Sequence, residues 1–247
     1  MPFRSAGRHR LQRGSMQYDT LNPRLAWVAE RVRQGAIFAD VGTDHAKLPI
    51  ALVHAGQVSF AIASDIGEGP AKIAAARIAA EGLSDAIRVV VCDGLTDIAG
   101  FAPTDIAICG MGGETVCEIL AASDSIRDPR IRLLLQPMTD FALVRRFLSD
   151  GGFEVVDEDI VSSDGRLYQC LVAVYSGKPY SIDEVEAELG RLNIKRLTPT
   201  FLEYVRRRKN IVEKCINGKR RAGADTSEEE GLLRGYEEIL EACCETE

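Results

Sequence analysis

Five short apolar runs, rich in Val and Ile and separated by helical segments, constrain the fold of this chain more than any other feature. A short and nearly continuous apolar run is typical of a parallel strand that is covered on both faces. The runs are residues 36–41, 59–66, 87–92, 105–109 and 132–136. Helices are predicted between them at residues 47–55, 69–81, 114–122 and 141–149. This alternation predicts an α/β fold with a doubly wound sheet.

After residue 150 the alternation stops, and two strand-like runs follow each other. Residues 153–161 and 167–175 flank Asp164-Gly165, a pair that favours the tight turn of an antiparallel hairpin. A Rossmann-like parallel sheet that ends in such a hairpin is typical of class I methyltransferases. An NAD-binding sheet would end in another parallel crossover, so the hairpin argues against a dehydrogenase.

The chain changes character at residues 177–179, Gly-Lys-Pro, which predict a domain boundary. Residues 199–217 and 226–242 have helical spacing and are joined by a polar connector at 218–224. They predict a small, coiled-coil-like helical hairpin. The apolar residues expected to face each other across it are Phe201, Leu202, Val205, Ile211, Val212, Ile216, Leu232, Leu233, Tyr236, Ile239 and Leu240.

Three parts of the chain are therefore expected: a disordered or non-native arm at 1–15, a first domain at 16–177 and a helical domain at 178–247. No apolar run approaches the ~20 residues that cross a bilayer, and the basic start lacks the apolar segment of a secretory signal. The chain has seven cysteines, an odd number, and no CxxC pair. This predicts reduced thiols rather than a disulfide framework or a zinc site. We expect a cytoplasmic monomer without a metal or a membrane partner.

The two predicted C-terminal helices carry opposite charge. Residues 195–221 contain ten Lys or Arg and two Glu, whereas residues 225–247 contain nine Asp or Glu and one Arg. One interpretation is that the two helices neutralise each other. The other is that the basic run Arg206, Arg207, Arg208 and Lys209 binds phosphate. The two interpretations are compatible.

The turn after the first predicted strand reads DVGTDH, residues 40–45. In an open α/β sheet, ligands bind beyond the carboxyl ends of the strands, and Gly42 lets the backbone turn sharply there. Asp44 stands where a GxGxxG motif has its second glycine, and its carboxylate would repel a pyrophosphate but attract a cation. This favours S-adenosylmethionine over NAD. As alternatives, Asp44 caps the next helix and His45 is an ordinary loop residue.

Carboxylates also follow the next two strands. Asp65 comes about 20 residues after the glycine turn, the spacing at which an acid holds ribose hydroxyls. The adjoining Ile66 is assigned to the same cofactor. Asp93-Gly94 ends the third strand, where the acid suits the adenine amine and the glycine admits the base. The alternative for this pair is a plain Asp-Gly turn.

The fourth strand ends in Gly110-Met111-Gly112-Gly113. A tight turn needs one glycine, and glycine costs conformational entropy, so packing does not explain three. The run predicts backbone close to a ligand. Gln136-Pro137 ends the fifth strand, where an amide suits a base edge and the proline stiffens the loop. Tyr168, on the last hairpin, either stacks on a substrate base or packs.

Taken together, the motifs resemble those of one enzyme family. DVGTDHAKLP, ASDIGEGP, DGL, ICGMGG, LLLQP and DGRLYQCLVA are similar to the bacterial tRNA (adenine-N1)-methyltransferases that modify position 22, over about residues 22–173. The resemblance implies an S-adenosylmethionine-dependent enzyme with a C-terminal coiled-coil domain that helps to hold tRNA. It implies cofactor contacts at Arg24, Asp40, Gly42, Asp44, His45, Asp65, Asp93, Gly94, Gly110 and Met111. As an alternative, Arg24 is a surface residue.

The reaction implied is methyl transfer to N1 of adenine, an in-line displacement that mainly needs alignment. N1 has a lone pair, so its attack needs no strong base, and the target base must be extruded from the tRNA fold. Residues 110–113 with Gln136 are candidates to hold its Watson–Crick edge. No catalytic base is assigned; Asp44 and Gln136 are candidates. The alternatives are a methyltransferase of another RNA position or of a protein, and a non-catalytic RNA-binding module.

Overall fold

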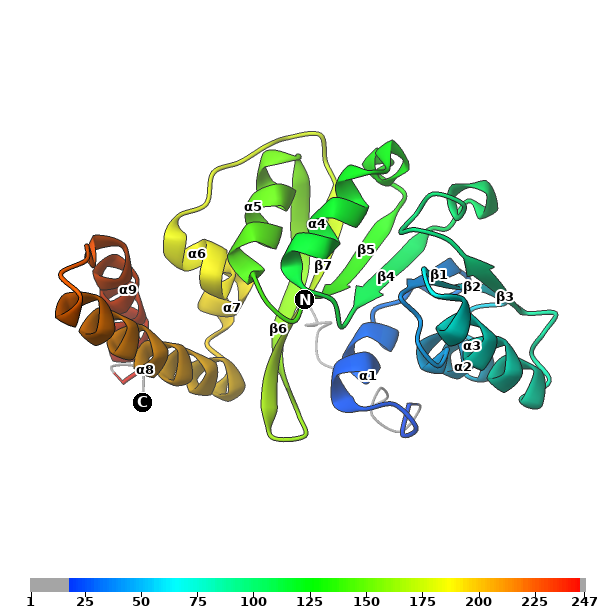
Figure 1. Cartoon of the computed structure of the whole chain (residues 1–247), viewed down its shortest axis with the longest axis horizontal. Coiled ribbons are helices and arrows are strands. Elements are labelled where there is room, and N and C mark those ends of the chain that lie inside the picture. Colours follow the sequence, from blue (N-terminus) through cyan, green and yellow to red (C-terminus); the bar gives the residue numbers. More distant parts are fainter. Residues whose placement is uncertain (1–17, 245–247) are drawn as a thin grey trace, which may run out of the picture.

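A seven-stranded sheet forms the centre of the computed structural model, which describes residues 18–244 (Figure 1). The strand order is β3-β2-β1-β4-β5-β7-β6, with β1 to β5 parallel and β7 antiparallel to β5 and β6. The strands are β1 (Ile37–Val41), β2 (Phe60–Asp65), β3 (Ile87–Val91), β4 (Asp105–Cys109), β5 (Arg132–Gln136), β6 (Phe153–Ser163) and β7 (Arg166–Tyr175). The doubly wound sheet and its closing hairpin are confirmed. The arm at 1–15 lies outside the described residues.

Helices cover both faces of the sheet. One face carries α1 (Pro23–Ala29), α2 (Lys47–His54) and α3 (Glu68–Ala80), and the other carries α4 (Gly113–Ala121) and α5 (Phe141–Asp150). Alternate strand residues point to opposite faces, so Phe38 packs under α1–α3 and its neighbour Ala39 packs under α4 and α5. Two short 3-10 helices, η1 (Ala99–Phe101) and η2 (Asp124–Arg127), lie in the crossovers.

The β6–β7 hairpin has the predicted tight turn and one irregularity. Asp164 and Gly165 have φ of 50° and 74°, as a type I′ turn requires. In β6, Val155 pairs with Ala173 but Asp157 pairs with Val172, so an extra residue forms a β-bulge. The bulge reverses the alternation of the strand beyond it. It places Glu158 opposite Leu171, on the face that α5 covers.

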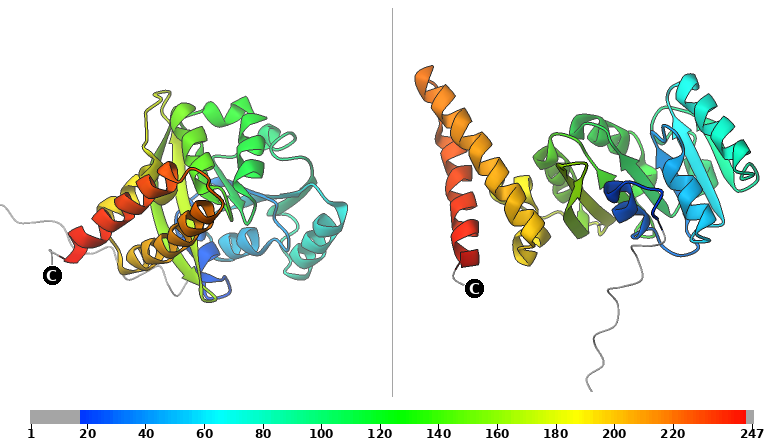
Figure 2. Two further views of the ribbon diagram at one scale, coloured as in Figure 1. Left: turned by 60° about the vertical axis from the view of Figure 1, so that its left-hand side comes forward. Right: turned by 90° about the horizontal axis from the view of Figure 1, so that it is seen from below.

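Four helices follow the sheet: α6 (Glu184–Leu189), α7 (Arg191–Arg196), α8 (Pro199–Arg221) and α9 (Ser227–Cys244). Figure 2 shows α8 and α9 as a hairpin at one end of the molecule, far from α2 and α3. Ion pairs Lys209–Glu237 and Lys219–Glu229 join the two helices in the order expected of antiparallel neighbours. A third apolar core, which includes Phe201, Val205 and Tyr236, seals them against Ile160 of β6.

Two expectations about this region were wrong, and two short helices were not foreseen. α8 continues through Gly218 to Arg221, because Lys219 and Arg220 pair with acids of α9 and basic residues suit a helix C-terminus. Ile211 is 53% exposed, since the buried stripe of α8 passes through Val212 and leaves its neighbour outside. The short helices α6 and α7 were not predicted, because six residues are too few to show a period.

Within residues 18–244, no helix has the length and apolar character needed to cross a membrane. The same part of the chain contains no group of three His, Cys, Asp or Glu side chains arranged to hold a metal ion.

Candidate active site

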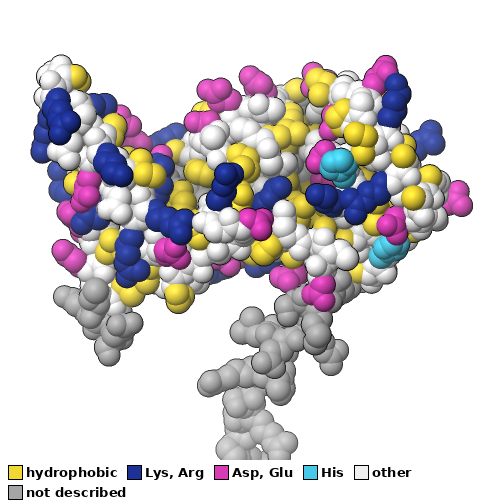
Figure 3. Space-filling model, turned by 60° about the horizontal axis from the view of Figure 1, so that its bottom comes forward, with side chains coloured by type: hydrophobic (Ala, Val, Ile, Leu, Met, Phe, Trp, Pro, Cys, Tyr) yellow, Lys and Arg dark blue, Asp and Glu magenta, His cyan; other side chains and the backbone are white. Residues whose placement is uncertain are grey.

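The carboxyl ends of the parallel strands form the lower edge of the sheet in Figure 1. The β6–β7 turn, where β7 begins, lies at the bottom of that view. Because β5 is antiparallel to β7, β5 runs downward and its carboxyl end faces this lower edge. Because β1 to β5 are parallel, the loops predicted to bind ligands all open onto this edge. Figure 3 turns this edge toward the reader. Lys and Arg side chains gather on the side of α8 and α9, and a second group lies beside a histidine at the other end.

The loop after β1 is fixed by its neighbours. The N–H groups of Gly42 and Thr43 donate to the carbonyl of Ser64, at 2.8 and 2.9 Å. Gly42 has a φ of 73°, and a Cβ at this position would overlap the methyl group of Met111. The absence of a side chain at Gly42 therefore lets the β1 and β4 loops approach each other.

Asp44 does not cap the helix that follows it. The N-cap of α2 is Ala46, and no side chain caps this helix, so the alternative role of Asp44 as a helix cap is excluded. The Asp44 side chain is 73% exposed and lies 3.5 Å from Nε2 of His45. An exposed carboxylate at this edge is free to attract a cationic ligand.

Asp40 is the buried acid of the site. Its Oδ2 accepts a hydrogen bond of 2.7 Å from Oγ1 of Thr43, which also is buried. Burial raises the pKa of Asp40 from 3.8 to about 7, although the Thr43 hydrogen bond and the charge of Arg24 act against this rise; nearby Asp65 adds to it. The carboxyl therefore changes charge close to neutral pH.

Asp65 and Ile66 present one polar and one apolar group side by side. Asp65 Oδ1 accepts from the N–H of Gly67 at 2.9 Å, and the side chain is half-buried. Ile66 is 70% exposed, which is unusual for an isoleucine and suits contact with a flat apolar ligand. On the next loop, Asp93 is exposed, and Gly94 has a φ of 56°.

The glycines after β4 differ in their roles. Gly110 has a φ of 80°, and its N–H donates to the carbonyl of Gln136 at 2.9 Å. A Cβ on Gly112 would lie 3.3 Å from Thr139 Oγ1. A Cβ on Gly113 would lie 2.6 and 2.7 Å from two backbone oxygens of the β5 loop, so Gly113 has a packing role that the sequence analysis excluded.

Arg24 of α1 reaches the same edge, and Gln136 holds it there. Arg24 Nη1 donates to Gln136 Oε1 at 2.5 Å, and the guanidinium lies 5.7 Å from the ring centroid of Tyr168. Gln136 Nε2 donates to the carbonyl of Pro137 at 2.9 Å, and Gln136 has no exposed surface. Both ends of the amide predicted to hold a base edge are thus engaged inside the protein. The hydrogen bond uses one of the five N–H groups of Arg24.

The basic run of α8 divides into two pairs. Arg206 and Arg207 are exposed, and Arg207 forms an i,i+4 ion pair of 2.5 Å with Glu203. Arg208 is partly buried and pairs with Glu188 of α6 at 2.8 Å. Lys209 pairs with Glu237 of α9 at 2.9 Å. The first interpretation of the charge pattern, mutual neutralisation, therefore holds at Lys209.

Thr43 and Ser64 belong to the site, but the sequence analysis missed them. Thr43 binds the Asp40 carboxyl and Ser64 fixes the β1 loop, yet small polar residues beside strand ends are too common to stand out. Backbone conformation gives a further signal. Three of the six non-glycine residues with positive φ in the described chain, Asp44, Ala46 and Asp140, lie in the loops after β1 and β5. Such strained positions cluster at functional sites.

Comparison with known proteins agrees with this geometry. The methyltransferase domain family matches residues 21–171, which include every loop described above. The tRNA (adenine(22)-N(1))-methyltransferase of Bacillus subtilis is 36% identical over 172 residues, which are 70% of this chain and 72% of that protein. The chain belongs to the tRNA (adenine(22)-N(1))-methyltransferase family. The resemblance inferred from the strand-end motifs is confirmed.

Solved structures agree with the chain's place in the tRNA (adenine(22)-N(1))-methyltransferase family. A protein of the NADB-Rossmann superfamily from Streptococcus agalactiae has a TM-score of 0.81 and 30% identity, covering 89% of this chain and 97% of that chain. A putative tRNA (m1A22) methyltransferase of Streptococcus pneumoniae, in complex with S-adenosyl-L-methionine, has a TM-score of 0.76 and 31% identity, covering 88% and 98%. The similarity therefore extends over the C-terminal helices.

The packing of Gly113 predicts a stability difference between two glycine substitutions. Gly113→Ala places a methyl group against backbone oxygens and should lower the free energy of unfolding by about 1–3 kcal/mol. Gly218→Ala, inside α8 with open space around it, should raise that free energy by about 0.5–1 kcal/mol. Urea unfolding measures both. A Gly113→Ala protein as stable as the wild type would contradict the packing role.

The pKa of Asp40 predicts how cofactor affinity depends on pH. Below the raised pKa of about 7 the carboxyl is neutral, and above it the carboxylate attracts a cationic ligand. Affinity for S-adenosylmethionine should therefore rise with pH, by at most about tenfold per unit below pH 7, and level off above it. Calorimetry at pH 6, 7 and 8 measures this change. Asp40→Asn should bind weakly and without the pH dependence.

The same shift has a consequence for stability. Asp40 has a higher pKa in the folded protein than in the unfolded chain. The free energy of unfolding therefore falls as pH rises from about 4 to about 7. The Asp40→Asn protein lacks this loss and should melt higher than the wild type at pH 8, with a smaller difference at pH 5. Equal differences at both pH values would contradict the assignment.

Proposed function

We propose that this chain transfers the methyl group of S-adenosylmethionine to N1 of the adenine at position 22 of bacterial tRNA. The observation that carries this proposal is the 36% identity to the Bacillus subtilis tRNA (adenine(22)-N(1))-methyltransferase. The Streptococcus pneumoniae relative, whose complex contains S-adenosyl-L-methionine, supports the cofactor. Because tRNA is the proposed substrate, the proposal places the protein in the cytoplasm.

The strand-end loops fit this cofactor. Asp65 offers a carboxylate for the ribose hydroxyls, and the exposed Ile66 offers an apolar surface for the adenine. Asp93 and Gly94 lie on the next loop, where they suit the adenine amine and the edge of the base. Asp44 and His45 line the end that receives the amino-acid part. S-adenosylmethionine supplies the methyl group, and the charges of Asp40 and Asp44 suit its cationic character.

The chain's task in the reaction is mainly alignment. Adenine N1 attacks the methyl carbon with its lone pair, the carbon–sulfur bond breaks, and the positive charge passes to the base. No proton has to leave N1 before it attacks, so the step needs no catalytic base, and Asp44 acts by its charge. Gln136 acts through Arg24, which it fixes at the edge of the site beside Gly110.

The acceptor base enters beside the loops after β4 and β5. Gly112, Pro137 and Tyr168 border this region, although the Tyr168 ring is already covered on one side by Arg24. The target adenine must leave its stack to reach the methyl group. Backbone groups of the two loops then hold its Watson–Crick edge, while the second domain, residues 178–247, binds the body of the tRNA through the basic run of α8.

Purified protein, labelled S-adenosylmethionine and bulk bacterial tRNA test this function. Nucleoside analysis should find the label in 1-methyladenosine, and mapping should place it at position 22. Asp65→Ala should weaken S-adenosylmethionine binding by at least about tenfold, because a ribose hydroxyl loses a charged partner. If the label appeared in another nucleoside or in a protein, the proposed acceptor would be wrong. Binding unchanged in Asp65→Ala would remove that residue from the cofactor site.

The two pairs in the basic run predict different effects on tRNA binding. Arg206→Gln with Arg207→Gln should weaken binding and reduce the slope of log K against log salt by about 1–2, with cofactor affinity unchanged. Lys209→Gln should change that slope less, since Lys209 is neutralised by Glu237. Lys72→Gln, an exposed lysine of α3, serves as the control. A salt slope that stays the same in the Arg206 and Arg207 variant would exclude α8 as a phosphate contact.

A further inference from the structure

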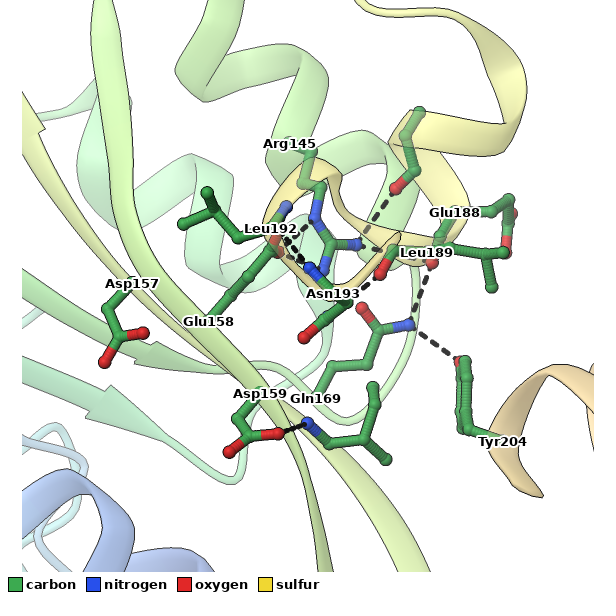
Figure 4. A network of polar contacts seen from close by, with 12 residues as sticks. Arg145, Asp157, Glu158, Asp159, Gln169, Glu188, Leu189, Leu192, Asn193 and Tyr204 are labelled. Atoms are coloured by element: carbon green, nitrogen blue, oxygen red, sulfur yellow. Dashed lines mark hydrogen bonds and ion pairs between the residues drawn. The ribbon is translucent and has the colours of Figure 1, made fainter. Parts of the chain in front are cut away.

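A buried ion pair joins the sheet to the C-terminal helices. Arg145 of α5 donates through Nε and Nη2 to Glu158 Oε2, at 3.1 and 2.8 Å, and the two side chains are 4% and 1% exposed (Figure 4). Burying two charges is expensive unless their remaining hydrogen-bonding groups are satisfied. Here the partners that satisfy them are backbone groups of α6 and α7.

Each charge of the pair serves one helix end. Arg145 Nη1 donates to the carbonyls of Ala187 and Glu188, at 3.0 and 3.3 Å, at the C-terminal end of α6. Glu158 Oε1 accepts from the N–H of Leu192 at 2.7 Å, in the first turn of α7. A cation at a helix C-terminus and an anion at an N-terminus both stabilise the helix. The pair thus binds the two short helices at the point where they meet.

Gly190 is the residue that allows this approach. It lies between α6 and α7 with a φ of 88°, and a Cβ there would overlap the Glu158 carboxylate. A side chain at this position would force either the Glu158 carboxylate or α7 to move, and both movements break the contact between them. The glycine therefore sets how close the C-terminal helices come to the sheet.

Two further contacts complete the joint. Gln169 of β7, which is fully buried, donates to the carbonyl of Glu188 at 2.9 Å and to the hydroxyl of Tyr204 at 2.7 Å, so it links the sheet to α8 (Figure 4). Arg196 of α7 donates to the Glu158 carbonyl and pairs with Asp157, both at 2.7 Å. Partial burial alone would raise the pKa of Asp157, but hydrogen bonds from Arg196 and Arg31 outweigh it and hold the pKa below its ordinary value.

The joint lies at the root of the α8–α9 hairpin, where β6 and β7 meet α6, α7 and α8. Its hydrogen bonds to α6 and α7 are made mostly to their backbone groups. Such bonds fix the position and the direction of the two helices, which apolar packing alone would not do. The basic face of α8 and the cofactor loops must engage one RNA molecule together, and two linked sites do so only when their separation is right.

We infer that Arg145, Glu158 and Gly190 are positioning residues for tRNA methylation: they fix the α8–α9 hairpin at the angle that lets one tRNA reach both the basic face and the site. This inference rests on the proposed function. It predicts that loosening the joint harms the use of tRNA while cofactor binding survives, which a role in overall stability alone would not produce.

The test compares two pairs of variants in the full-length protein. Gly190→Ala breaks the contact between α7 and Glu158. Gly177→Ala is its control, because Gly177 also has a positive φ, but the nearest atom that a Cβ there would meet is 3.7 Å away. Arg196→Gln removes a surface tether, and Lys195→Gln removes a neighbouring charge from the same turn of α7. The second pair keeps the test decisive where Gly190→Ala does not fold.

The readouts are KM and kcat for tRNA, the calorimetric affinity for S-adenosylmethionine, and small-angle scattering. Gly190→Ala should raise KM for tRNA about tenfold or more and Arg196→Gln about threefold, with both controls within about twofold of the wild type. Cofactor affinity should not change, and scattering should show a wider distribution of shapes for Gly190→Ala.

Several outcomes would overturn the inference. Wild-type KM in both test variants would show that the angle of the hairpin does not matter, and a parallel loss of cofactor affinity would reduce the joint to a stability role. A wild-type protein that leaves tRNA unmethylated would instead refute the proposed function, and this inference with it. Equal loss in Arg196→Gln and Lys195→Gln would assign the effect to charge.

Discussion

The parallel direction of β1 to β5 is the constraint on which the rest of this molecule depends. It carries five strand ends to one edge, so residues as far apart in sequence as Asp40 and Asp93 open onto the same surface. Burying an acid there has an electrostatic cost: burial raises the pKa of Asp40 to about 7, and nearby Asp65 adds a smaller contribution. Arg24 is the counter-charge, and Gln136 keeps it in place.

The second end of the molecule is held by a buried ion pair as well as by the apolar core that contains Phe201 and Tyr236. Arg145 and Glu158 would destabilise the fold if either stood alone, and together they are stable because the ends of α6 and α7 satisfy them. The bulge in β6 is what turns Glu158 toward α5. The sheet and the α8–α9 hairpin are thereby joined by directional bonds, which hold an angle better than apolar contacts do.

Much of this arrangement could be predicted from the sequence. The strands, the helices α2 to α5 and the closing hairpin were placed within two residues of their observed bounds, because apolar periodicity and turn chemistry are local properties. The helical hairpin was predicted with its connector too long and Ile211 on the wrong side. The glycine run was interpreted as backbone near a ligand, yet Gly113 is explained by packing against a loop more than twenty residues away.

The sequence by itself determined the order of strands and helices, the chemistry of each strand-end loop and the family, since each is written in contiguous residues. Only the tertiary structure decided which side chains meet. Arg24 and Gln136 are 112 residues apart, and nothing local predicts their hydrogen bond. The joint at Glu158 is equally hidden, because it depends on a one-residue bulge and on backbone groups that every sequence possesses. Pairing of distant groups is a property of the folded chain, not of any segment of it.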